Sequence, residues 1–356
     1  MAAFPGNSPL RSVPADYHPA GEGQWYPLGE GKDRGKKLYF TDQSFGRGGA
    51  PQSLVLVPGN PECSYLFRKV LRGLLAKNLS QLRIVTLDHI GFGLSDQATR
   101  PMDPLDHAAN LARLIDHLDL RRVTLVVHDW GGPIGLGAFL ATPYRLRKLL
   151  ILNSGIHPLP RNGLDYRNHP FPFLSWSRLS FLVPDRCWGA FASQAIASRA
   201  CSRSTLIREL LRRFLAARAA AGRIDPYRMQ FASRANVASS KHLARLAGHW
   251  CEIRNSQDPQ LNEFYQRLRT EVPLHWGPTG TNIQARLLVG RWDPLGRVES
   301  ARLWLQALPQ LEDRMVGFAD AGHFLPERRP AEIADSLYEL LGTCDASGGV
   351  AAPPGS

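Results

Sequence analysis

The most constraining feature of the sequence is a continuous apolar run at residues 123–127 that leads directly into His128-Asp129-Trp130-Gly131-Gly132. An uninterrupted run of this kind predicts a parallel strand buried on both faces. The two glycines permit a sharp turn and a close approach to a following helix, which the pattern predicts at 133–141. In a strand, turn and helix of this form, Asp129 would stand above the carboxyl edge of a sheet, where enzymes place a nucleophile. A carboxylate that caps the helix is the structural alternative.

Strand-like and helical segments alternate along most of the remaining chain. Helices are predicted at 64–76, 105–118, 300–308 and 331–341, and strands at 38–40, 53–57, 83–87, 149–152, 286–290 and 314–318. Such alternation indicates a mainly parallel α/β sheet flanked by helices. It stops at residue 155, where a helical and arginine-rich segment begins.

The predicted domain organisation follows from this interruption. Residues 31–154 and 273–341 form the two parts of one α/β core, and residues 155–272 form a helical insertion. Residues 1–30 are predicted to be poorly ordered and residues 342–356 to be a disordered tail. The hydrophobic content of 44% is ample for a buried core.

Composition also restricts the location and the chemistry. No window approaches the length of apolar residues that a membrane span needs, and the first residues lack a secretory pattern. We therefore predict a cytoplasmic protein. The five cysteines form no CxxC pair, so the sequence suggests neither a zinc site nor a disulfide framework. No metal or other cofactor is predicted.

The formal net charge of +12 is concentrated in the helical insertion, where residues 155–272 contain eighteen Lys and Arg against eight Asp and Glu. Residues 204–215 combine apolar residues at helical spacing with arginines. This pattern predicts either an ordinary surface helix or a basic amphipathic face that contacts anionic lipid or an acidic partner protein. We predict no nucleic-acid partner, since no binding module or basic stripe interleaved with aromatic residues is present.

Two further residues complete a catalytic constellation. A carboxylate nucleophile forms an ester with its substrate, and water activated by a histidine must then cleave that ester while a second acid orients the histidine. Asp293 follows the predicted strand at 286–290, and His323 lies in a glycine-containing loop before the last helix. The chain order of nucleophile, acid and base fits this chemistry. Taken singly, a turn-forming Asp293 and a buried structural His323 are equally good interpretations.

Three motifs carry a specific resemblance. They are Pro58-Gly59-Asn60-Pro61, the segment 88–96 with sequence DHIGFGLSD, and the turn around Asp129. On these motifs the chain resembles the haloalkane dehalogenases of the α/β-hydrolase superfamily, from about residue 38 to 341. The resemblance implies an α/β-hydrolase fold with a helical cap and the conversion of a haloalkane and water to an alcohol and halide. It assigns Asp129 as nucleophile, His323 as general base and Asp293 as the orienting acid, because the segment 152–155 after the preceding strand contains no acid.

The same resemblance gives Trp130 and Asn60 a role. A departing halide needs donors that are not themselves reactive, and an indole N–H and a side-chain amide supply them. The substrate is expected to be small and apolar. From position and size, the residues predicted to line its pocket are Phe92, Trp188, Phe191 and Phe324.

Alternatives remain open at this point. The β-lactone decarboxylases of bacterial olefin synthesis share the nucleophile, base and acid, and would act on long-chain lipid-derived substrates. An epoxide hydrolase would use cap tyrosines, for which Tyr166, Tyr227 and Tyr265 are available. A non-catalytic binding protein of the same fold is a third alternative. Pro58 stands where the family usually has histidine, which predicts a different shape for that loop.

Overall fold

The computed structural model describes residues 4–18, 21–46, 52–77, 79, 81–156, 166–216, 224–249 and 258–342. Within them, eight strands form one sheet in the order β1-β2-β4-β3-β5-β6-β7-β8. The strands are β1 (Gly23–Pro27), β2 (Lys37–Phe45), β3 (Gln52–Val57), β4 (Leu82–Leu87), β5 (Val123–Asp129), β6 (Leu146–Ser154), β7 (Gln284–Gly290) and β8 (Met315–Phe318). β1 and β2 are antiparallel to their neighbours, and all the other pairs are parallel. The predicted mainly parallel α/β sheet is confirmed.

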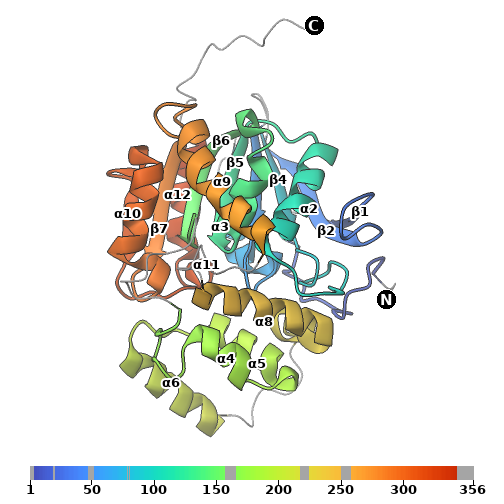
Figure 1. Ribbon diagram of the computed structural model, residues 1–356, viewed down its shortest axis with the longest axis vertical. Coiled ribbons are helices and arrows are strands. Elements are labelled where there is room, and N and C mark those ends of the chain that lie inside the picture. The colour runs from blue at the N-terminus through green and yellow to red at the C-terminus, as the bar shows by residue number, and fades with distance from the viewer. Residues whose placement is uncertain are drawn as a thin grey trace, which may run out of the picture.

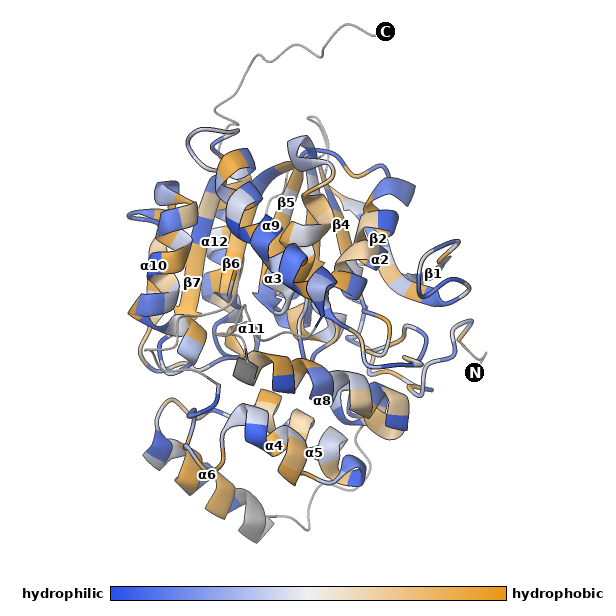
Figure 2. Cartoon of the chain, in the orientation of Figure 1, coloured by the Kyte–Doolittle hydropathy of each residue, from blue (hydrophilic) through white to orange (hydrophobic). Residues whose placement is uncertain are grey.

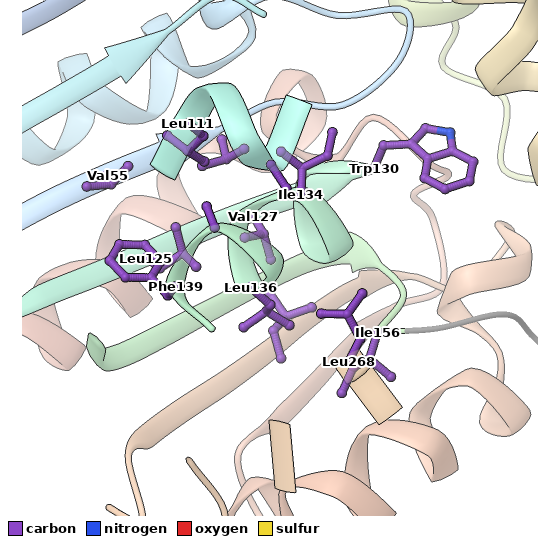
Figure 3. Close-up of a cluster of buried hydrophobic side chains, with 14 of the residues drawn as sticks. Val55, Leu111, Leu125, Val127, Trp130, Ile134, Leu136, Phe139, Ile156 and Leu268 are labelled. Carbon is purple, nitrogen blue, oxygen red and sulfur yellow. The ribbon is translucent and has the colours of Figure 1, made fainter. Parts of the chain in front are cut away.

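Helices cover both faces of this sheet (Figure 1). Alternate side chains of a strand point to opposite faces, so Leu125 and Val127 pack on one side and Val126 on the other. The first face is covered by α2 (Pro104–His117), α3 (Gly131–Phe139), α9 (Pro259–Trp276) and α10 (Val298–Ala307), and the second by α1 (Arg68–Leu75) and α12 (Pro330–Gly342). Figure 3 shows the packing of Leu136 and Phe139 on β5. Because both faces are covered, the central strands are apolar throughout.

A group of helices that comes between β6 and β7 in the sequence lies beyond the carboxyl ends of the strands (Figure 1). We call α4 to α8 the cap. They are α4 (Trp176–Leu182), α5 (Asp185–Ala197), α6 (Arg203–Ala216), α7 (Pro226–Met229) and α8 (Arg234–His249). The predicted insertion also included most of α9, but the ring of Phe264 on that helix packs against Gly137 of α3. α9 therefore lies on the sheet, because its apolar side contacts the core.

The N-terminal segment differs from the expectation of poor order. Leu10 and Tyr17 are buried, and the Tyr17 hydroxyl donates a hydrogen bond to Asp88 Oδ2 over 2.8 Å. The hydroxyl of Ser8 donates to the carbonyl of Gly93 over 2.6 Å. Composition predicted a poorly ordered segment, since it does not reveal these contacts with a distant loop. The predicted tail beyond residue 342 lies outside the described residues.

Among the described helices, none has the length and apolar character that crossing a bilayer requires.

Candidate active site

Asp129 stands at the sharp turn between β5 and α3. Its φ is 53°, in the left-handed region that L-residues adopt rarely and that recurs at functional turns. The turn needs a glycine at 131, since a Cβ there would lie 2.2 Å from the carbonyl oxygen of Val57. Strand, glycine and helix thus hold the carboxylate of Asp129 at the carboxyl edge of the sheet.

His323 links this carboxylate to a second one. Its Nε2 lies 3.2 Å from Asp129 Oδ2, and its Nδ1 lies 3.0 Å from Asp293 Oδ2. His323 comes from the loop between β8 and α11 (Leu325–Arg328), and Asp293 directly follows the turn after β7. The structure therefore brings together the three residues that the sequence places far apart, in the order acid, imidazole, acid.

Two hydrogen bonds hold the carboxylate of Asp293 in place, and the sequence did not predict either of their donors. Asn153 Nδ2 donates to Asp293 Oδ2 over 2.9 Å, and the Tyr166 hydroxyl donates to Asp293 Oδ1 over 2.8 Å. Asn153 comes from the end of β6 and Tyr166 from the segment before α4. Asp293 is 1% exposed, so these bonds satisfy a carboxylate that water does not reach. Nothing in the local sequence around either donor indicates this convergence.

Electrostatics favour a charged imidazole between the two acids. Burial lowers the pKa of His323, but the neighbouring carboxylates of Asp293 and Asp129 raise it more, and the result lies well above the usual value. For Asp293, burial raises the pKa, while the charge and hydrogen bond of His323 lower it to a net value below the usual one. The free site accordingly holds His323 as an imidazolium paired with Asp293.

The His323–Asp293 pair is expected to make stability fall with rising pH. Because the folded pKa of His323 is raised, its contribution is full below pH 6.5 and is lost as pH rises through the raised value. The lowered pKa of Asp293 keeps that carboxylate ionised down through pH 3.8. The difference in urea midpoint between the wild type and His323→Gln should therefore be largest between these two pH values and shrink at alkaline pH. A difference that grows towards alkaline pH would contradict the pairing.

Asn60 contacts Asp129 through its backbone and a cap serine through its side chain. The Asn60 N–H donates to Asp129 Oδ1 over 2.7 Å, and the Ser240 hydroxyl donates to Asn60 Oδ1 over 2.6 Å. The indole of Trp188 in turn donates to Ser240 Oγ over 2.9 Å. Among the described residues, the buried Asn60 Nδ2 has no hydrogen-bond partner. The relay from Trp188 through Ser240 thus engages the amide oxygen of Asn60, while the amide nitrogen of the same residue is left as an unused donor.

Trp130 follows Asp129 at the start of the turn and is 2% exposed. Figure 3 shows its indole extending from the end of β5 away from Val127 and Leu136. Asn60 and Trp130 therefore lie on two different segments next to Asp129, and the anion site stays a prediction.

A cavity of about 370 Å³ connects this site to the cap. Its wall is mainly apolar and includes Asp129, His323 and Asp293 together with the predicted Phe191 and Phe324. Asn60 and Trp130 are not among its lining residues. Two other pocket predictions are wrong for this cavity: Phe92 packs edge-on against Phe231, and Trp188 is fully buried in its contact with Ser240. Size and position in the sequence could not distinguish the aromatic residues that line the cavity from those that pack in the core.

A model of the protein family described as "alpha/beta hydrolase fold" matches residues 52–330, which is most of the chain. The chain belongs to the α/β hydrolase fold family.

This α/β hydrolase is similar to curated proteins of two activities. A cis-3-alkyl-4-alkyloxetan-2-one decarboxylase of Shewanella oneidensis is 34% identical over 171 residues, which cover 45% of this chain and 48% of the relative. Haloalkane dehalogenase 2 of Mycobacterium bovis is 28% identical over 138 residues, which cover 38% of this chain and 43% of the relative. The chain thus spans about half the length of the curated relatives that it matches.

Solved structures agree with the fold. The haloalkane dehalogenase DpaA of Paraglaciecola agarilytica has a TM-score of 0.58 at 20% identity, covering 94% of this chain and 97% of that one. An esterase of Exiguobacterium antarcticum has a TM-score of 0.58 at 17% identity, covering 90% of this chain and all of that one. Identities this low show the α/β hydrolase fold and no particular activity.

A buried acid next to the site was missed by sequence reasoning. Glu62 is fully buried, and its carboxylate lies 2.8 Å from His128 Nδ1 and accepts the backbone N–H of Gly59 over 3.1 Å. His128 Nε2 lies 2.9 Å from the carbonyl oxygen of His323. Since a carbonyl oxygen only accepts, this nitrogen donates the hydrogen bond, which ties the loop of His323 to β5. Glu62 directly follows the loop motif in sequence, which is the one signal that could have indicated it.

Glu62, His128 and His323 also form the one group among the described residues whose potential ligand atoms lie close enough, within 4.8 Å, for a metal ion. The imidazole nitrogens of this group already have partners: His128 contacts Glu62 and a backbone carbonyl, and His323 contacts Asp129 and Asp293. The donor set is therefore engaged in hydrogen bonds and ion pairs, and its arrangement fits proton handling better than metal binding.

Proposed function

We propose that this α/β hydrolase uses Asp129 as a nucleophile, forms an alkyl ester with its substrate and hydrolyses carbon–halogen bonds. The observation that carries the proposal is that each carboxylate oxygen of Asp129 has its own partner. Oδ1 accepts the backbone N–H of Asn60, Oδ2 faces His323 Nε2, and both Asp129 and His323 line an apolar cavity. A carboxylate held in this way can present an oxygen to an sp³ carbon while the base waits beside it.

In the first step, an Asp129 oxygen attacks the carbon that bears the halogen, and the carbon–halogen bond breaks with its electron pair leaving on the halide. The unpartnered Nδ2 of Asn60 is a suitable donor for that anion, and the Trp130 indole is a second candidate. Both donors lack basicity, so neither competes with Asp129 for the carbon. The product of this step is a neutral alkyl ester of Asp129.

Esterification then prepares His323 for the second step. The charge of Asp129 is one of the causes that raise the pKa of His323, and the ester removes it. His323 can now release its Nε2 proton to solvent, with Asp293 still orienting the ring through Nδ1. Its Nε2 takes a proton from water, and the resulting hydroxide attacks the carbonyl carbon of the ester. The backbone N–H of Asn60 lies where it stabilises the oxyanion that forms on Oδ1. The bond from the carbonyl carbon to the alkyl oxygen then breaks, and the alkyl oxygen takes the proton from Nε2 and leaves as the alcohol. The remaining acid proton of Asp129 passes to His323, which restores the carboxylate and the imidazolium.

A second candidate is the decarboxylation of a β-lactone, which two of the similar curated proteins favour by name. There Asp129 would attack the sp³ ring carbon that is bonded to the ring oxygen, and that carbon–oxygen bond would break to give a carboxylate. Loss of carbon dioxide from this carboxylate would then form the alkene and release Asp129. This route needs no attacking water. Halide hydrolysis leads because its second step needs a base that activates water, and His323, held by Asp293, lies beside Asp129 for that task.

The cap tyrosines support an epoxide hydrolase less well. Tyr166 lines the cavity, but its hydroxyl donates a hydrogen bond to Asp293. The Tyr227 hydroxyl donates a hydrogen bond to Glu327 over 2.9 Å. Tyr265 is buried on α9 in the core of the sheet. An epoxide oxygen needs a free donor opposite the nucleophile, and the geometry assigns two of these hydroxyls to other acceptors.

Ser240→Ala is expected to lower kcat/KM by about tenfold, since it removes the donor that orients the Asn60 amide. The loss should be larger for a chloroalkane than for an iodoalkane, because chloride depends more on hydrogen-bond donors. Ser240→Thr should restore most of the activity, and Ser180→Ala, another buried cap serine, serves as the matched control. An equal loss for every leaving group would show that Ser240 acts on folding rather than on Asn60.

The function is tested by incubating the wild type with a bromoalkane, a styrene-type epoxide and a disubstituted β-lactone, and following release of bromide, diol and carbon dioxide. We expect bromide release with alcohol as the organic product. Carbon dioxide and alkene without bromide turnover would overturn dehalogenation in favour of lactone decarboxylation. Diol formation alone would favour the epoxide hydrolase, and no turnover of any substrate would favour a binding protein.

A further inference from the structure

The cap carries an unusual share of the exposed apolar surface. Among the described residues, half of the exposed large hydrophobic side chains lie between residues 173 and 211. They are Phe173, Leu174, Phe181, Leu182, Ile207, Leu210 and Leu211. Several are more than half exposed, including Phe181 at 68% and Leu211 at 59%. Clustered apolar exposure of this kind marks a contact surface rather than the scatter found on any protein.

On α6 this apolar surface is bordered by arginines. Ile207 and Leu211 are four residues apart and so lie on one side of the helix, and Arg208 and Arg212 form the adjacent row. All four side chains are exposed. The acid of this helix, Glu209, points elsewhere, accepting from the Ser198 hydroxyl over 2.8 Å and the Arg199 N–H over 2.9 Å. The outer side of α6 is therefore apolar and cationic.

The same helix borders the cavity that leads to Asp129. Leu206 and Leu210 of α6 line the cavity together with Leu174, and both Leu174 and Leu210 are also exposed. The wall of the cavity is thus continuous with the apolar surface of the cap. In Figure 1, α6 lies on the side of the cap away from the sheet, and Figure 2 shows hydrophobic residues along it.

We infer that the outer side of α6 docks on an anionic phospholipid bilayer, from which an apolar substrate enters the cavity between Leu174 and Leu210. Ile207 and Leu211 enter the boundary between headgroups and acyl chains, and Arg208 and Arg212 pair with lipid phosphates. A bilayer fits the surface because the two rows run along an exposed helix and combine burial of apolar area with cationic charge. The docking stands independently of the proposed function, and only the account of substrate entry depends on it.

Docking is tested by cosedimentation of the full chain with vesicles of mixed phosphatidylcholine and phosphatidylglycerol, without substrate. The wild type should sediment with these vesicles, less with phosphatidylcholine alone and less at high salt. Ile207→Ser/Leu211→Ser and Arg208→Gln/Arg212→Gln should each lower the partition coefficient by about tenfold. Val298→Ser/Leu274→Ser, which changes comparably exposed residues of the hydrolase core, should leave it unchanged.

Equal sedimentation of the wild type and both cap variants, or no sedimentation at all, would overturn the inference. If the wild type is a dimer by light scattering and Ile207→Ser/Leu211→Ser makes it a monomer, the surface belongs to a second copy instead. Asp129→Asn should bind vesicles as the wild type does, so a failure of the proposed chemistry is distinguishable from a failure of docking. With an active enzyme, the cap variants should lose turnover of a vesicle-borne long-chain substrate and keep that of a short soluble one.

Discussion

His323→Gln is expected to release one leaving group per enzyme molecule and then stop. Glutamine can stay near Asp293 and Asp129 but cannot take a proton from water, so the alkyl ester of Asp129 forms and persists. Steady-state kcat should fall by about a thousandfold or more, while the initial burst of halide remains. Rapid-mixing measurement of halide gives the burst, and mass spectrometry of the quenched protein should show the added alkyl group on the peptide that contains Asp129.

The matched control is His242→Gln, which changes another partly exposed histidine that is paired with a carboxylate, Asp103. This variant should turn over as the wild type does and accumulate no adduct. If His323→Gln retains steady turnover, His323 is not the base. If it shows neither burst nor adduct, the base is required before the ester forms, which contradicts the two-step mechanism proposed above.

Asp129→Asn is expected to remove both the burst and the turnover. The amide keeps the size of the side chain and can still contact Asn60 and His323, but its oxygen is a far weaker nucleophile. Loss of a nucleophile typically lowers kcat by about 10⁴-fold or more. Activity is measured as halide release on freshly purified protein, with intact mass spectrometry to exclude deamidation back to aspartate.

A suitable control is Asp119→Asn, because Asp119 is also an aspartate with positive φ, at 44°, but lies in a surface turn. It should retain full activity. Thermal unfolding of both variants separates chemistry from folding. Halide release by a folded Asp129→Asn that is comparable to the wild type would remove Asp129 as nucleophile, whatever the fate of the other proposals.

Much of the fold could be predicted because its signals are local. The apolar run at 123–127 and the glycines after it predict the buried strand β5 and the turn to α3, and the structure has both. The edge strand β1 was missed, since its five residues GQWYP are half-exposed and show no continuous apolar run. The position of α9 was also missed, because helical periodicity reveals that a helix has an apolar side but not which partner covers it.

The candidate site divides in the same way. Chain order alone suggested Asp129, Asp293 and His323, because strand ends of a parallel sheet converge on one edge. The residues that fix Asp293 were not suggested in this way, because chain order does not show that the side chains of Asn153 and Tyr166 reach it. Tyr166 was considered only as a proton donor to an epoxide, whereas the structure directs its hydroxyl to Asp293.

The sequence by itself indicated the α/β hydrolase fold, the position of Asp129 at the turn after a buried strand and the basic character of the cap, since each depends on residue types at short spacing. Tertiary structure decided which side chains meet. It moved Trp188 from the predicted pocket to a buried hydrogen bond with Ser240, and it left the side chains of Arg208 and Arg212 on α6 exposed. The physical reason is that hydrogen bonds and burial depend on the direction of a side chain in three dimensions, which contacts between distant segments fix.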